Sequence, residues 1–269
     1  MTRNSDHDEP LGDQAMTTAN DVRVFATPQE LFHAAAEEVA RTAAQAVAAR
    51  GRFTVALSGG STPRSLYTLL AASARQFPWQ QTFFFWGDER HVPPDSPESN
   101  YRMADESLLS KVPVPAGNVH RILAENPDAA AAASAYEQTL QTFFHLDSAH
   151  LLPELDLILL GMGPDGHTAS LFPGTQALHE QSRLAVANHL DQLNTDRLTL
   201  TYPVLNAAGC VLFLVSGADK APALREVLEG TEAIELYPAK GVQPKSGRLL
   251  WMLDQAAASQ LQHTEKSNS

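Results

Sequence analysis

The residues best suited to chemistry lie in a glycine-rich segment that follows the most apolar run of the chain. Leu155 to Leu160 leads into Gly161-Met162-Gly163-Pro164-Asp165-Gly166-His167. A neutral imidazole can take a proton from water, because the unperturbed pKa of histidine is about 6.5. We therefore interpret His167 as a general base. Asp165, two residues before it, would hold its tautomer or contact the substrate.

The same segment formally matches the dinucleotide-binding pattern G-x-G-x-x-G. That pattern requires a helix directly after the glycines and an acidic residue about 20 positions later. Pro164 and the break at Pro173-Gly174 fit this requirement poorly. No pair of histidines has the spacing of metal ligands. We therefore expect neither a cofactor nor a metal site.

A second glycine-containing loop, between the apolar run Phe53 to Leu57 and a helix led by Pro63, is a candidate binding loop. Glycines let the backbone approach a ligand closely, and a helix N-terminus offers free N–H groups to an anion. We predict that the loop residues Ser58, Gly59, Gly60, Ser61 and Thr62 line a phosphate or sugar site. Many strand-to-helix turns contain glycine without binding anything. The Gly-Lys-Ser/Thr of an ATP-binding Walker loop is absent.

Three basic residues follow or precede other apolar runs. Arg90 ends the segment Trp86-Gly87-Asp88-Glu89-Arg90, in which Asp88 or Glu89 could orient it, and Arg197 and Lys220 lie beside later apolar runs. We predict that these cations bind phosphate or stabilise negative charge, each charged hydrogen bond contributing about 1.5–3 kcal/mol. For any one of them alone, a solvated surface position is the commoner case.

The amino-acid composition restricts the classes of partner that this protein is expected to bind. The formal net charge is −12, which repels nucleic acid and anionic membranes, so neither is expected as a partner. No run of 18 apolar residues and no secretory signal is present, and the single cysteine suits a reducing cytosol. We expect a cytoplasmic protein with a small-molecule substrate, either a monomer or a weak homodimer. Cys210, inside an apolar run, is interpreted as a buried strand residue.

The elements that must position these residues alternate between strand and helix. Apolar runs at 22–26, 53–57, 82–86, 155–160, 198–201 and 211–215 predict strands, and the patterns at 28–50, 63–70, 100–109, 129–144 and 221–228 predict helices. This order predicts an α/β fold with a doubly wound, mostly parallel sheet and helices on both faces. Ligands bind beyond the carboxyl ends of strands in such sheets. We predict one domain over 22–258, with polar tails at 1–21 and 259–269.

Taken together, these segments resemble the 6-phosphogluconolactonase family, within the wider glucosamine-6-phosphate isomerase/deaminase-like superfamily. The resemblance covers about 22–258. The matching motifs are Ala56-Leu57-Ser58-Gly59-Gly60-Ser61-Thr62-Pro63, Trp86-Gly87-Asp88-Glu89-Arg90, Ser99-Asn100-Tyr101-Arg102-Met103, the run from Gly161 to Pro173, Arg197-Leu198-Thr199-Leu200-Thr201, Ser216-Gly217-Ala218-Asp219-Lys220 and Tyr237-Pro238-Ala239. Trp251 and Leu253-Asp254 also match.

The resemblance implies hydrolysis of 6-phospho-D-glucono-1,5-lactone to 6-phospho-D-gluconate in the oxidative pentose phosphate pathway, without a cofactor. His167 would activate water, with Asp165 assisting it or holding the substrate. The resemblance also implies that Arg90, Arg197 and Lys220 contact phosphate or the developing negative charge. It does not say which cation contacts which group.

Three other functions stay open at this point. Deaminases and isomerases of the superfamily share the Asp-Gly-His turn but typically continue it with Ile-Ala-Phe-Asn-Glu-Pro, where this chain has Thr168-Ala169-Ser170-Leu171-Phe172-Pro173. A serine hydrolase using Ser58 would normally need a G-x-S-x-G elbow, which Ser58 lacks. A non-catalytic sugar-phosphate sensor would want an attached DNA-binding domain, which the short acidic N-terminal segment does not supply.

Overall fold

A six-stranded parallel sheet forms the centre of the protein. The structure, a computed structural model, describes residues 21–72, 77–148 and 151–262. The strand order is β1-β9-β8-β5-β2-β3, and every pairing in it is parallel. The strands are β1 (Asp21–Phe25), β2 (Phe53–Leu57), β3 (Thr82–Trp86), β5 (Leu157–Leu160), β8 (Cys210–Val215) and β9 (Arg248–Asp254). The predicted doubly wound parallel sheet is confirmed.

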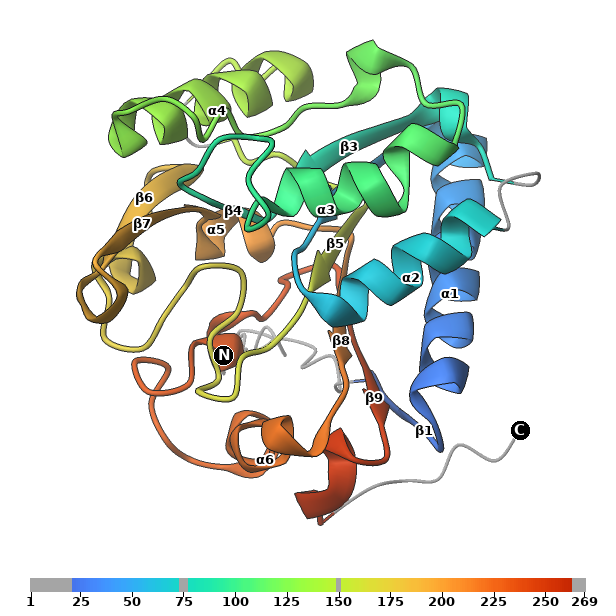
Figure 1. Cartoon of the computed structure of the whole chain (residues 1–269), viewed down its shortest axis with the longest axis vertical. Helices are drawn as coiled ribbons and strands as arrows, with labels where there is room; N and C mark the ends of the chain where they lie inside the picture. Colours follow the sequence, from blue (N-terminus) through green and yellow to red (C-terminus); the bar gives the residue numbers. More distant parts are fainter. Residues whose placement is uncertain (1–20, 73–76, 149–150, 263–269) are drawn as a thin grey trace, which may run out of the picture.

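Helices cover the sheet, and their ends follow from local sequence. They are α1 (Pro28–Arg50), α2 (Ser61–Ala72), α3 (Asn100–Ser107), α4 (Ala129–Phe144), α5 (Tyr202–Leu205) and α6 (Ala221–Glu229). The hydroxyl of Thr27 accepts from the backbone N–H of Glu30 at the start of α1, and Gly51 ends that helix in the left-handed region at φ 71°. In Figure 1, α1 and α2 lie on one side of the sheet and α5 and α6 on the other.

A separate three-stranded antiparallel sheet lies beside the central one. Its order is β4 (Asp88–Arg90), β7 (Thr195–Leu200) and β6 (Ala185–Leu190), and α4 packs against it (Figure 1). The prediction that 198–201 adds a strand to the parallel sheet was wrong. The pairing of Arg90 with Arg197 places β7 against β4 instead. This long-range pairing brings two of the predicted cations side by side.

Two further differences from the sequence prediction concern the ends of the chain. No strand was predicted at β9, yet β9 lies between β8 and β1 and carries the buried Trp251, stacked on Phe213 with ring centroids 3.8 Å apart. Asp21 was assigned to the first tail but belongs to β1, where it pairs with Leu250. The first residues of the second tail are also structured, because they lie in the short helix η9. Residues 1–20 and 263–269 of the two predicted tails lie outside the described residues.

Short 3₁₀ helices connect the main elements. They are η2 (Trp79–Gln81), η3 (Leu109–Lys111), η4 (Ala116–Asn118), η5 (Gln176–His179), η6 (Asp191–Leu193), η7 (Ala218–Lys220), η8 (Pro238–Gly241) and η9 (Ala257–Gln260). Cys210 is buried at the start of β8, as predicted, and burial raises the pKa of its thiol. Among the described residues, no helix is long and apolar enough to cross a membrane.

Candidate active site

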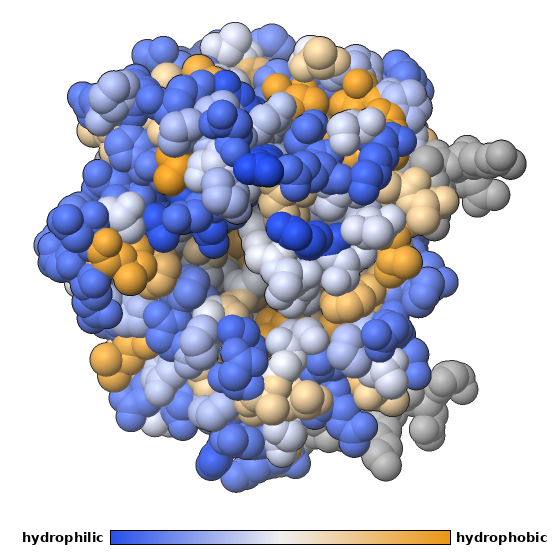
Figure 2. Space-filling view, in the orientation of Figure 1, coloured by the Kyte–Doolittle hydropathy of each residue, from blue (hydrophilic) through white to orange (hydrophobic). Residues whose placement is uncertain are grey.

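All the predicted site residues except Asp165 and Arg197 line one pocket, at the carboxyl ends of three neighbouring strands. The segments that follow β2, β5 and β8 all contribute to a cavity of about 240 Å³. The face of the molecule in Figure 2 is mostly hydrophilic and is hollowed near its middle. The lining comprises Ser58, Gly59, Gly60, Ser61, Thr62, Pro63, Asp88, Arg90, Asn100, Gly161, Met162, Gly163, Pro164, His167, Ala169, Leu214, Val215, Ser216 and Lys220. The pocket therefore lies where open parallel sheets bind ligands.

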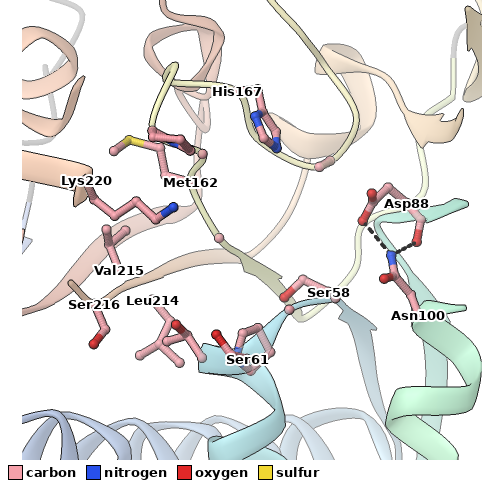
Figure 3. A pocket seen from close by; sticks show the side chains of 18 of the residues that line it. Ser58, Ser61, Asp88, Asn100, Met162, His167, Leu214, Val215, Ser216 and Lys220 are labelled. Carbon is pink, nitrogen blue, oxygen red and sulfur yellow. Dashed lines mark hydrogen bonds between the residues drawn. The ribbon is translucent and has the colours of Figure 1, made fainter. Parts of the chain in front are cut away.

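His167 enters this pocket from the loop after β5, with its ring directed inward (Figure 3). Its Nδ1 lies 2.6 Å from Oδ1 of Asp165, which also accepts from the backbone N–H of His167 at 3.2 Å. The same interaction explains the electrostatics of the carboxylate. Burial is the largest influence and opposes the charge on Asp165, but the hydrogen bonds from the side chain and backbone of His167, together with the charge of its imidazole, outweigh burial and lower the pKa of this carboxyl. Asp165 thus holds the proton at Nδ1 and leaves Nε2 as the free basic nitrogen.

The loop after β2 is held rigidly under the pocket. The phenol of Tyr67 accepts from the backbone N–H of Ser58 and donates to its carbonyl, both at 2.9 Å. Gly59 packs so closely against Asn100 that a β-carbon there would lie 1.8 Å from the Asn100 amide oxygen, and Gly60 has φ 105°. Both glycines are therefore required by the backbone path. Within the described chain, the buried Ser58 hydroxyl has no hydrogen-bond partner, so no base activates it for a serine-hydrolase mechanism.

Two buried carboxylates, Glu89 and Asp88, support the side of the pocket that β4 and the start of α3 form. Glu89 is 2% exposed and accepts from the backbone N–H groups of Arg90, Asn100 and Tyr101 and from the hydroxyl of Ser99. Burial raises the pKa of Glu89 in spite of these hydrogen bonds.

Asp88, 7% exposed, accepts from the amide of Asn100 at 3.2 Å and from the hydroxyl of Ser170 at 2.7 Å, and dashed lines mark the Asn100 contacts in Figure 3. These two carboxylates join β4 to the N-terminus of α3 and to the histidine loop.

The three predicted cations occupy different places. Arg90 and Lys220 line the pocket, whereas Arg197 is not among the lining residues and lies opposite Arg90 in the β4–β7 pairing. Burial and the neighbouring positive charge of Arg90 lower the pKa of Arg197. Lys220 pairs with Asp219 at 2.9 Å. The expectation that Asp88 or Glu89 orients the Arg90 side chain was wrong, because its guanidinium donates to the carbonyl of Glu98.

Sequence reasoning missed several residues of the site. Asn100 was noted only as part of a motif, yet its amide bridges Asp88 and packs on Gly59. Phe172 was used only to distinguish families, yet its ring stacks on the imidazole of His167 with centroids 4.0 Å apart. Its position, five residues after His167 and just before Pro173, was the only available signal.

Comparisons with known proteins agree with this geometry. Residues 26–251 match the family model described as glucosamine-6-phosphate isomerases/6-phosphogluconolactonase. Among curated proteins, the 6-phosphogluconolactonase of a Nostoc species is 47% identical over 80% of this chain and 88% of the relative. That of a Synechocystis species is 44% identical over 90% of this chain and 99% of the relative.

Solved structures give the same result. A 6-phosphogluconolactonase from Trypanosoma cruzi superposes with a TM-score of 0.82 at 29% identity, covering 93% of this chain and 100% of the other. A monomeric glucosamine-6-phosphate deaminase superposes with a TM-score of 0.74 over 89% of this chain and 99% of the other. At 22% identity, that second similarity concerns the fold alone.

Proposed function

Because the chain belongs to the glucosamine-6-phosphate isomerase/6-phosphogluconolactonase family, we propose that it hydrolyses 6-phospho-D-glucono-1,5-lactone to 6-phospho-D-gluconate, with His167 as the general base. The observation that carries the proposal is the Asp165–His167 pair, whose imidazole lines a pocket together with the cations Arg90 and Lys220. The curated relatives named 6-phosphogluconolactonase support this substrate. We place the reaction in the oxidative pentose phosphate pathway.

In the proposed reaction, Nε2 of His167 takes a proton from a water molecule as its oxygen attacks the lactone carbonyl carbon. The carbonyl oxygen becomes negative and needs a nearby positive charge or hydrogen-bond donor. Arg90 is a pocket cation suited to this role. When the ring C–O bond breaks, the imidazolium returns its proton to the departing ring oxygen, which leaves as a hydroxyl group, and the new carboxylic acid then loses its remaining proton to solvent to give the carboxylate. Asp165 stabilises the imidazolium while it exists.

The phosphate of the substrate would be held away from the reacting carbon. The loop from Ser58 to Thr62 leads into the N-terminus of α2, where backbone N–H groups favour an anion, and Lys220 lines the same pocket. Arg197, beside Arg90, adds positive charge at the rim of the site. A local excess of cations is needed because the chain as a whole carries a formal charge of −12. Remote phosphate binding would orient the lactone for attack.

The test is lactone consumption. The lactone is generated in situ, and its loss is followed against spontaneous hydrolysis for wild type, His167→Ala and His189→Ala. His189 is a matched control because it also contacts an aspartate, Asp196, at 2.9 Å but does not line this pocket. We expect acceleration by wild type and by His189→Ala, with loss in His167→Ala.

Two results would count against the proposal in different ways. Full activity in His167→Ala would remove this residue from its role and leave the reaction intact. No acceleration by wild type, together with ammonia release from glucosamine 6-phosphate, would instead establish the deaminase activity of the superfamily.

A further inference from the structure

The imidazole of His167 is covered on one face by an aromatic ring. Phe172 stacks on it with centroids 4.0 Å apart and an interplanar angle of 21°. The phenyl ring is only partly buried. Because the phenyl ring lies nearly parallel to the imidazole and against its face, it restricts rotation of the imidazole.

One edge of the same imidazole is fixed as well. Nδ1 lies 2.6 Å from Asp165, and the backbone of Gly163 passes so close that a β-carbon there would lie 2.1 Å from Nδ1. The ring therefore has one face against Phe172 and one edge against Asp165 and Gly163, which leaves Nε2 on the free side. Figure 3 shows the imidazole of His167 directed into the pocket.

A strained turn brings Phe172 back over His167. Thr168 and Leu171 form an isolated antiparallel bridge, and the N–H of Leu171 donates to the carbonyl of Thr168 at 2.9 Å. Within this turn Ala169 has φ 46°, in the left-handed region that disfavours residues with a β-carbon. Ser170 holds the turn in place by donating from its hydroxyl to Asp88 at 2.7 Å. Backbone strain that is maintained by surrounding contacts is a recurrent feature of functional sites.

We propose that Phe172 is a positioning residue for His167, which fixes the plane of the imidazole so that Nε2 faces the attacking water. The inference rests on the proposed role of His167 as the base. Stacking acts before the reaction, by limiting rotation of the imidazole, and during it, because the face of an aromatic ring attracts the positive charge that the imidazole acquires.

Three variants test the proposal. Phe172→Leu keeps an apolar side chain and removes the ring, and Phe172→Tyr restores the ring. Phe144→Leu is a matched control, since Phe144 is also partly buried and packs on aromatic rings, but these belong to Phe85 and Phe143 rather than to His167. For each variant, kcat and KM for the lactone and the thermal midpoint are measured. Proton NMR of the His167 ring reports stacking directly, since a ring stacked above it shifts these protons upfield.

We expect about a tenfold lower kcat with unchanged KM in Phe172→Leu, loss of the upfield shift, and recovery of both within about twofold in Phe172→Tyr. Phe144→Leu should lower only the thermal midpoint. Wild-type kcat in Phe172→Leu would overturn the proposal, as would equal losses in the leucine and tyrosine variants. The NMR shift is independent of turnover. Its presence in a wild type that does not hydrolyse the lactone would therefore contradict the proposed function and leave the stacking intact.

Discussion

Two carboxylate centres flank the pocket, and they differ in almost every physical respect. Asp165 lies at the rim, its side chain 46% exposed, and serves a single histidine. Glu89 is 2% exposed and accepts hydrogen bonds from four different groups, three of them backbone N–H groups. The Asp165–His167 pair is open to solvent, as the proposed proton transfer between water and substrate requires. The buried Glu89 carboxylate reaches neither water nor substrate unless the hydrogen bonds around it break.

This difference distinguishes the proposed catalytic pair, Asp165 and His167, from Glu89, a carboxylate that stabilises the fold around the pocket. A carboxylate with one partner and solvent access can follow the protonation of its histidine. The Glu89 carboxylate accepts from the backbone N–H groups of Asn100 and Tyr101 and so replaces the missing partners at the start of a helix, here α3. Variants at the rim should therefore change rates, whereas variants at Glu89 should change stability.

The largest expected effect is on turnover at the rim. His167→Ala should lower kcat about 10²–10⁴-fold, the usual contribution of a general base, while the affinity for 6-phosphogluconate stays close to that of wild type. Because His167 is partly exposed, the thermal midpoint should change little. Steady-state kinetics, product titration and thermal unfolding would check this. A large fall in the thermal midpoint of His167→Ala would instead show that His167 has a structural role.

The next effect is on stability in the buried centre. Glu89→Ala leaves four donors without their acceptor and should lower the free energy of unfolding by roughly 3 kcal/mol. The thermal midpoint should fall by about 6–12 °C. Glu106→Ala is the control, since Glu106 is an exposed carboxylate on α3, the helix whose N-terminus Glu89 contacts, and it pairs with Arg102 at the surface. A midpoint unchanged in Glu89→Ala would show that water replaces the carboxylate.

A third variant changes Arg197, which lies beside the strand that carries Glu89. Arg197 lies opposite Arg90, which follows Glu89 directly in β4. Arg197→Ala should reduce the preference for phosphorylated over unphosphorylated gluconolactone by about tenfold, the equivalent of one charged hydrogen bond. The ratio of kcat/KM for the two lactones measures this. An unchanged ratio would assign the phosphate to Lys220 or Arg90.

The smallest effect is on the pH dependence of stability. The pKa of Asp165 is lowered in the folded state, so its ionised form favours folding. That contribution is present above the ordinary pKa of 3.8 and is lost as the pH falls through the lowered value. Because the side chain is 46% exposed, the effect should be well under about 1 kcal/mol.

Denaturant unfolding of wild type and Asp165→Asn between pH 2 and pH 7 would reveal the difference. The gap between them should narrow toward acid. A gap that is constant over this range would contradict the lowered pKa.

The central sheet was largely predictable because apolar strands such as β5 and β8 are buried on both faces and read as continuous apolar runs. The position of Ser58, His167 and Lys220 at one pocket was predictable for the same reason, since each follows such a strand. β6 was missed because its sequence, Ala-Val-Ala-Asn-His-Leu, mixes polar and apolar side chains. The pairing of Arg90 with Arg197 joins segments more than a hundred residues apart, and no local pattern encodes that register.

The stacking of Phe172 on His167 was unpredictable for another reason. It depends on the left-handed conformation of Ala169, and alanine gives no sequence signal for that conformation. Glycine or asparagine at this position would have suggested a turn. The hydrogen bonds that maintain it, from Ser170 to Asp88 and from Ser170 to Thr199, again come from distant parts of the chain.

The placement of β9 between β8 and β1 has a consequence for the order of folding during synthesis. β1 is made before β9, which is its one partner among the described strands and ends at Asp254. Until the ribosome has added β9, β8 is therefore an open edge and β1 is unpaired. The sheet closes only once β9 has emerged, so nascent chains that stop before β9 should expose the edge of β8 to other chains and depend on chaperones.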